Sequence, residues 1–226
     1  MVPGAPRSAQ YATHAAPPKS QADPGSACAL TGPAPTPTIA PVTSSHEGHL
    51  PKGIVEVYTG DGKGKTTAAL GLALRALGAG LRVAVLQFLK GGAHTSELSM
   101  LPRLGPRLWV QRFADKVTLF GLGQGDPTPE DFQAVARGWE AAAEVISSGA
   151  WDVVILDEIN NVLAAKLLDV QDVLEVLRHR PGYVEVVCTG RGAPEELLEA
   201  AELITEMRCV KHPYDRDLGA RRGIED

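Results

Sequence analysis

The residues best suited to chemistry in this sequence form one glycine-rich run, Thr59-Gly60-Asp61-Gly62-Lys63-Gly64-Lys65-Thr66-Thr67. The run follows an apolar stretch at 54–58 and precedes a helical pattern at 68–77. A glycine-rich turn between a strand and a helix leaves backbone N–H groups free to point at one spot, and the positive end of the helix adds to that field. We therefore expect this run to surround a polyphosphate.

Lys65 and Thr66 have the most specific expected roles within the run. The lysine would reach the phosphates, and the threonine hydroxyl would complete the coordination shell of a magnesium ion. The pattern G-x-x-x-x-G-K-[ST] requires glycine at Thr59, and this chain supplies it one place later, at Gly60. A flexible Gly/Lys surface loop is the alternative. The strand before, the helix after and the second lysine, Lys63, favour a nucleoside triphosphate site.

Composition limits the classes of protein to which this chain can belong. Its 226 residues suit one domain of ordinary size plus an appendage. Lys and Arg total 22 against 27 Asp and Glu, a net charge of -5, which argues against a broad nucleic-acid surface. The 3 cysteines lack C-x-x-C spacing, so neither a disulfide framework nor a zinc site is indicated. No apolar run approaches a membrane span of about 20 residues, and we expect a cytoplasmic protein without membrane or nucleic-acid partners.

Two regions of different character follow one another along the chain. Residues 1–50 are rich in Pro and Ala without apolar periodicity, which predicts a disordered tail. In the domain at 53–226, apolar strand patterns alternate with helical patterns; the strands are expected at 54–58, 82–88, 108–113, 151–156, 184–189 and 203–207. This alternation predicts an α/β protein with a mostly parallel sheet and helices on both faces, and with the glycine-rich run it indicates a RecA-like P-loop NTPase fold.

Polar residues at the ends of these strands are further candidates, because ligands of open parallel sheets collect at the carboxyl ends of the strands. Asp157-Glu158 follows a buried strand in the manner of a Walker B segment, and we assign Glu158 with Thr66 to the metal. The alternative is a pair that caps the next helix. Arg191, between two glycines, could pair with phosphate or be a solvated turn residue. Lys90 is a less specific candidate for anion contact.

The sequence has no candidate nucleophile of its own. It contains no G-x-S-x-G elbow, and no cysteine has an activating base beside it in sequence. A protein that binds MgATP without such a group either hydrolyses it with water or receives the nucleophile on a second substrate.

Several motifs occur in order between Gly53 and Asp226, and together they resemble the P-loop corrinoid adenosyltransferases, which act on cob(I)yrinic acid a,c-diamide or cob(I)alamin. The resemblance is carried by 59–67, Gln87-Phe88-Leu89-Lys90-Gly91, Asp152 to Glu158, Thr189-Gly190-Arg191-Gly192, Val210-Lys211-His212-Pro213-Tyr214 and the ending Gly219 to Glu225. The T-G-R-G and K-H-P-Y segments make it much more specific than the P-loop alone.

The resemblance implies a reaction in adenosylcobalamin biosynthesis. The Co(I) of a reduced corrinoid attacks the 5′-carbon of ATP and triphosphate leaves. Lys65, Lys63, the loop amides, Arg191, and magnesium held by Thr66 and Glu158 would stabilise the departing charge. The catalytic residues would be Lys65, Glu158 and Arg191. The family also implies a homodimer, and a Co(II)-reducing flavoprotein is the expected partner.

This chain departs from the family pattern at three places. Val117 to Phe120 stands where some relatives carry two aromatics beside the corrin ring, so Phe120 alone would take that part. The family's basic, helical N-terminal segment is replaced by the Pro-rich tail. Asp61 stands where many relatives have asparagine.

Two other functions remain open at this stage. The first is a RecA-like ATP-hydrolysing switch or motor, in which Glu158 would orient the attacking water. The second is a nucleotide-binding regulatory module without turnover.

We predict that deletion of residues 1–45 leaves the domain folded, because nothing in this segment has the apolar pattern needed to pack. The melting temperature of the truncated protein should match that of the full chain. A large drop in melting temperature would mean that the segment packs on the domain.

Overall fold

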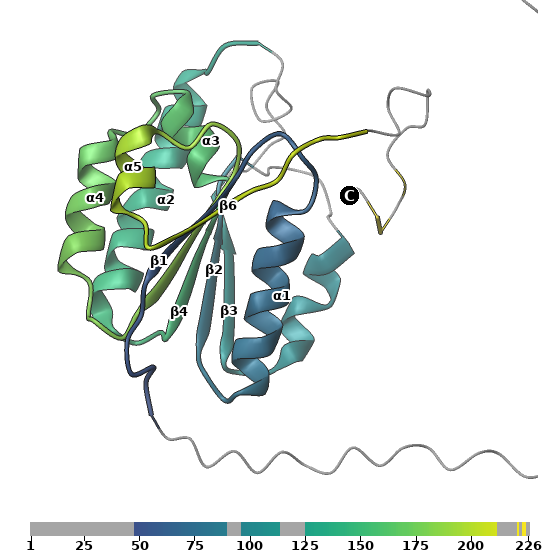
Figure 1. Ribbon diagram of the computed structural model, residues 1–226, viewed down its shortest axis with the longest axis vertical. Helices are drawn as coiled ribbons and strands as arrows, with labels where there is room; N and C mark the ends of the chain where they lie inside the picture. The colour runs from purple at the N-terminus through teal and green to yellow at the C-terminus, as the bar shows by residue number, and fades with distance from the viewer. Residues whose placement is uncertain (1–47, 90–95, 114–124, 212–220, 222, 225–226) are drawn as a thin grey trace, which may run out of the picture. The chain divides into compact units, whose positions relative to one another are not determined.

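The strands form where short apolar, β-branched runs lie between turn residues, and they assemble into one six-stranded sheet in the described part of the chain (Figure 1). The computed structural model describes residues 48–89, 96–113, 125–211, 221 and 223–224. These belong to the compact unit Val42–Asp226. The predicted tail up to residue 47, Lys90, Phe120 and the His212-Pro213-Tyr214 motif lie outside the described residues.

All pairings in the sheet are parallel, in the order β3-β2-β4-β5-β1-β6. The strands are β1 Val55–Thr59, β2 Val83–Gln87, β3 Leu108–Arg112, β4 Val153–Asp157, β5 Glu185–Thr189 and β6 Leu203–Glu206. β5 lies between β1 and β4. The strand that precedes Arg191 therefore adjoins both the strand that leads into the glycine-rich run and the strand that ends at Asp157. The predicted α/β fold with a parallel sheet is confirmed.

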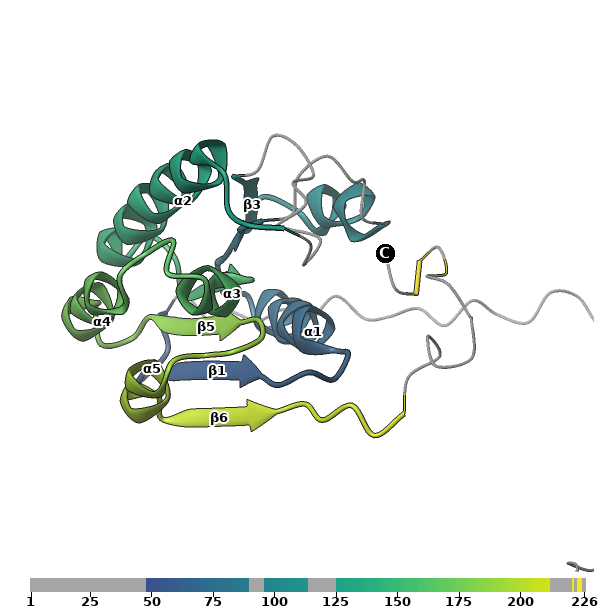
Figure 2. The ribbon, with the colours of Figure 1, turned by 90° about the horizontal axis from the view of Figure 1, so that it is seen from above.

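Helices cover both faces of the sheet, as predicted (Figures 1 and 2). One face carries α1 Lys65–Gly78, and the other carries α2 Pro129–Ser148, α3 Ile159–Ala164, α4 Val170–His179 and α5 Glu195–Ala200. The 3₁₀ turns η1 Ser96–Ser99 and η2 Leu101–Leu104 precede β3. Among the described residues, no helix combines the length and apolar character that crossing a membrane requires.

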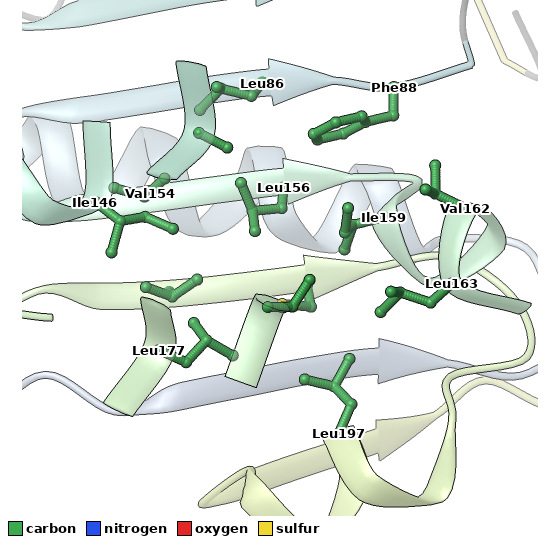
Figure 3. Close-up of a cluster of buried hydrophobic side chains, with 14 of the residues drawn as sticks. Leu86, Phe88, Ile146, Val154, Leu156, Ile159, Val162, Leu163, Leu177 and Leu197 are labelled. Atoms are coloured by element: carbon green, nitrogen blue, oxygen red, sulfur yellow. The ribbon is translucent and has the colours of Figure 1, made fainter. Parts of the chain in front are cut away.

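The core has two parts because successive strand residues point to opposite faces of the sheet. On the α1 face, strand residues such as Val85 and Ile155 pack against the alanines Ala69, Ala73 and Ala76. On the other face larger side chains dominate; Leu86, Leu156, Ile146, Leu177 and Leu197 belong to this cluster (Figure 3). Burial of strands on both faces explains why their sequences are continuously apolar.

Side-chain caps mark the starts of α2 and α4. The Thr128 side chain accepts a hydrogen bond from Asp131 N at 3.3 Å, and Asp131 Oδ2 accepts one from Thr128 N at 2.8 Å, which forms a capping box at α2. The Asp169 side chain likewise accepts from Gln171 N at α4. Threonine and aspartate are both residue types that favour the N-cap position of a helix. The six-residue helix α3 was not predicted from the sequence.

Two carboxyl groups meet on neighbouring strands β1 and β5. Glu56 is buried and accepts a hydrogen bond from Tyr58 Oη at 2.5 Å, while Glu185 Oε2 accepts one from Ile54 N at 2.7 Å. Burial, followed by the hydrogen bond to Glu56, raises the pKa of Glu185 to about 7. The folded state therefore favours the protonated form of Glu185, and it loses stability as the pH rises from the ordinary carboxyl pKa to about 7.

We predict that Glu185→Gln raises the melting temperature at pH 8 and changes it little at pH 5. Glutamine keeps an oxygen acceptor for Ile54 N and offers Glu56 an N–H in place of the shared proton. Thermal melts across this pH range test the effect. Glu199→Gln, on the exposed surface of α5, is the control and should leave the pH dependence unchanged. Identical pH profiles for wild type and Glu185→Gln would contradict the assignment.

Candidate active site

The glycine-rich run is a rigidly supported loop between β1 and α1. Gly60 and Gly64 have φ of 91° and 120°, which favours glycine. The backbone after β6 supports the loop: Gly62 N donates to Met207 O at 2.6 Å, and Met207 N donates to Thr59 O at 2.8 Å. A Cβ atom at Gly60 would lie 2.5 Å from Met207 O. The glycines therefore permit the loop backbone to approach the backbone at Met207 closely. A flexible surface loop, the alternative considered above, would not need this approach.

Lys65 lies across this loop and is held by it. Its Nζ donates to Gly60 O at 2.6 Å and to Gly62 O at 2.8 Å. Burial, and then the charge of Arg191, lower the pKa of Lys65 from its ordinary value, while Glu158 and Asp61 oppose the shift. The structure thus brings these four predicted site residues within electrostatic reach of one another.

Other residues of the run lie at the surface or in the first turn of α1. Asp61, Lys63 and Thr67 are exposed, and Lys63 Nζ donates to the backbone oxygen of Ile224 near the end of the chain. Thr59 Oγ1 accepts a hydrogen bond from Ala193 N at 3.4 Å, so the threonine that replaces the consensus glycine ties the loop to the segment after Arg191.

Asp157 connects the loop helix to the sheet. It is 1% exposed, and its Oδ1 accepts hydrogen bonds from Thr66 Oγ1 at 2.8 Å and Thr189 Oγ1 at 2.7 Å. Its Oδ2 accepts one from Gln87 Nε2 at 3.1 Å, and Arg112 Nε donates to Gln87 Oε1 at 2.8 Å. Sequence reasoning chose Glu158 from the acidic pair and left out Asp157, Thr189, Gln87 and Arg112. Their common position at the carboxyl ends of strands is the signal that could have found them.

Glu158 and Arg191 leave neighbouring strands and approach the same place. Glu158 precedes α3 with φ of 69°, and its backbone N donates to Thr189 Oγ1 at 3.1 Å. Arg191 is exposed and follows Gly190, whose φ is 129°. Because the charge of Arg191 disfavours the protonated form of Lys65, the two cations repel each other at this edge of the sheet. An anion bound between them would relieve that repulsion.

We predict that Gly60→Ala lowers the affinity for MgATP at least tenfold and also lowers the melting temperature. The added Cβ would meet Met207 O at a backbone conformation that alanine rarely adopts. Isothermal titration calorimetry and thermal melts test this. Gly71→Ala in α1 is the matched control, because a Cβ there meets no atom within 4 Å, and alanine favours a helix by about 1 kcal/mol. Wild-type ATP affinity in Gly60→Ala would contradict the assignment.

This chain is similar in sequence to several known proteins. The family model described as ATP:corrinoid adenosyltransferase BtuR/CobO/CobP matches residues 51–225. The corrinoid adenosyltransferase of Pseudomonas aeruginosa is 35% identical over 179 residues, which is 77% of this chain and 84% of that protein. That of Escherichia coli K12 is 36% identical over 175 residues, 77% and 86% of the two chains. The flagellar accessory protein FlaH of Methanocaldococcus jannaschii aligns in structure over 70% of this chain and 72% of its own, with a TM-score of 0.45 and 18% identity. This chain belongs to the ATP:corrinoid adenosyltransferase family.

Proposed function

We propose that this protein transfers the 5′-deoxyadenosyl group of ATP to the Co(I) ion of a corrinoid and releases triphosphate, as a step of adenosylcobalamin biosynthesis. The observation that supports this most directly is the pair of cations, Lys65 and Arg191, beside the amides of the glycine-rich loop. This arrangement holds polyphosphate charge, and it occurs in a member of the corrinoid adenosyltransferase family.

In this reaction the electron pair that attacks comes from the substrate. The pair on Co(I) forms the cobalt–carbon bond at C5′, while the C5′–O bond breaks and its electrons leave with the triphosphate. No proton transfer by a side chain is needed. The task of the protein is to align the two substrates and to stabilise negative charge as it grows on the leaving group.

Lys65 changes partners when it performs this task. Its ammonium group, which donates to Gly60 O and Gly62 O in the structure, would donate to phosphate oxygens instead. The backbone amides of the loop and the N-terminus of α1 add donors that are already in place. Arg191, reaching in from β5, would pair with the far end of the triphosphate.

The residues present fit a magnesium ion. The Thr66 hydroxyl and the Asp157 carboxylate are 2.8 Å apart, and Glu158 follows at the same strand end. Oxygen ligands of this kind, together with substrate phosphates and water, are what magnesium requires. We propose that Thr66 and Glu158 bind the ion and that Asp157 orients the Thr66 hydroxyl through their hydrogen bond. Bound there, the ion would supply positive charge to the phosphates.

Family membership and composition support the remaining features of the proposal. Residues 53–226 form the catalytic domain, and residues 1–50 are a tail. We propose Phe120 as the residue for the position beside the corrin ring that the family resemblance implies, and Lys63 and Lys90 as sources of positive charge near the nucleotide. The enzyme acts as a cytoplasmic homodimer that receives Co(I) from a flavoprotein reductase.

We predict that incubation with chemically reduced cobalamin and MgATP yields tripolyphosphate in step with the loss of Co(I). The corrin absorption spectrum measures the loss of Co(I). Little ATP should be consumed when corrinoid is omitted. Lys65→Ala should lower the transfer rate by about two to three orders of magnitude, because it removes a charge that stabilises the leaving group.

As a control, the folding of Lys65→Ala is checked by circular dichroism and by its melting temperature. Both should stay close to those of the wild type, because the side chain that is lost is only half-buried. ADP and orthophosphate as the main products, formed without corrinoid, would overturn the transferase proposal and favour an ATP-hydrolysing switch.

A further inference from the structure

Two adjacent asparagines at the start of α3 contact the loop that carries Arg191. Asn161 Oδ1 accepts a hydrogen bond from the backbone N of Arg191 at 2.5 Å. Asn160 is fully buried, and its Nδ2 donates to Tyr58 O and Gly190 O, each at 3.2 Å. Both side chains therefore bind the backbone of segments that are far from them in sequence.

Asn160 links the strand that enters the phosphate loop to the loop after β5. Tyr58 is the penultimate residue of β1, and Gly190 directly follows β5. Both partner atoms are carbonyl oxygens, which only accept hydrogen bonds, so the amide nitrogen must face them. Gly190 N also donates to Tyr58 O at 3.2 Å, so the same carbonyl receives two donors. Asn160 thus connects the end of the strand that precedes the glycine-rich run to the residue before Arg191.

Close packing leaves the Arg191 loop little freedom beside the asparagines. A Cβ at Gly190 would lie 2.4 Å from Asn161 Oδ1 and 3.1 Å from Asn160 Cβ. The positive φ of Gly190 directs the chain along this path. The next residue is then held through its own N–H, which sets the direction in which its side chain leaves the backbone.

We propose that Asn160 and Asn161 are positioning residues that fix the Arg191 loop so that the guanidinium group faces the triphosphate. This inference rests on the proposed function. Arginine has many rotamers, and ordering an exposed one costs conformational entropy. An anchored backbone reduces that cost, and a small displacement of a charge that acts in the transition state lowers the rate steeply.

The test is a double-mutant cycle between Asn161→Ala and Arg191→Ala, measured as corrinoid adenosylation with saturating MgATP. Asn161→Ala alone should lower kcat about tenfold. The KM for ATP should change less than about threefold, because Lys65 and the loop amides still bind the phosphates. In the Arg191→Ala protein, the second substitution should cause no further loss, because the group being positioned is gone.

Asp169→Ala is the matched control. It removes a similar bond at the start of α4, which Gln171 N donates to the exposed Asp169 side chain at 2.9 Å. It should lower the melting temperature without changing kcat. An unchanged kcat in Asn161→Ala, or independent effects that multiply in the double variant, would overturn the inference. Failure of the proposed function is distinct, because it would show in the wild-type protein as absence of corrinoid-dependent tripolyphosphate.

Discussion

The site depends on one buried carboxylate, Asp157, at the carboxyl end of β4. A charge removed from water must be compensated by hydrogen bonds, and here three donors supply them. The donors come from α1, β2 and β5, namely Thr66, Gln87 and Thr189. The requirement to satisfy Asp157 therefore holds the first turn of the phosphate-loop helix against the ends of the central strands. Thr66, Gln87 and Thr189 are thereby held beside one another at this edge of the sheet.

The phosphate loop is assembled from distant parts of the chain. Its glycines allow the backbone at Met207 to approach closely, and Met207 is in turn placed by the pairing of β6 with β1. Lys65 meanwhile satisfies the carbonyl groups of Gly60 and Gly62. The loop is thus supported by hydrogen bonds from within the chain, given both by the backbone at Met207 and by the Lys65 side chain. Preorganisation of this kind is how a site stabilises charge effectively.

The positive charge of the described site suits the chemistry of the family. The described site also has no side-chain nucleophile, which that chemistry does not require. The charge of Arg191 adds to burial in lowering the pKa of Lys65, and in the function we propose a bound polyphosphate would relieve the repulsion between these two cations. Asn160 and Asn161 of α3 contribute to this arrangement, because they form hydrogen bonds with the backbone that carries Arg191. A substrate that brings its own electron pair requires the protein to supply geometry and positive potential.

Signals that act over a few residues determined much of this protein from sequence alone. The glycine-rich run, the cap at Thr128 and the cap at Asp169 depend on neighbouring backbone groups, and alternating apolar runs suffice for a parallel sheet. Strand ends then predicted where the polar residues would gather. Tertiary structure decided which of them touch: Thr66 donates a hydrogen bond to Asp157, and Asn161 accepts one from the backbone N of Arg191. These contacts join residues tens of positions apart, and they follow from the placement of β5 between β1 and β4, which no local pattern encodes.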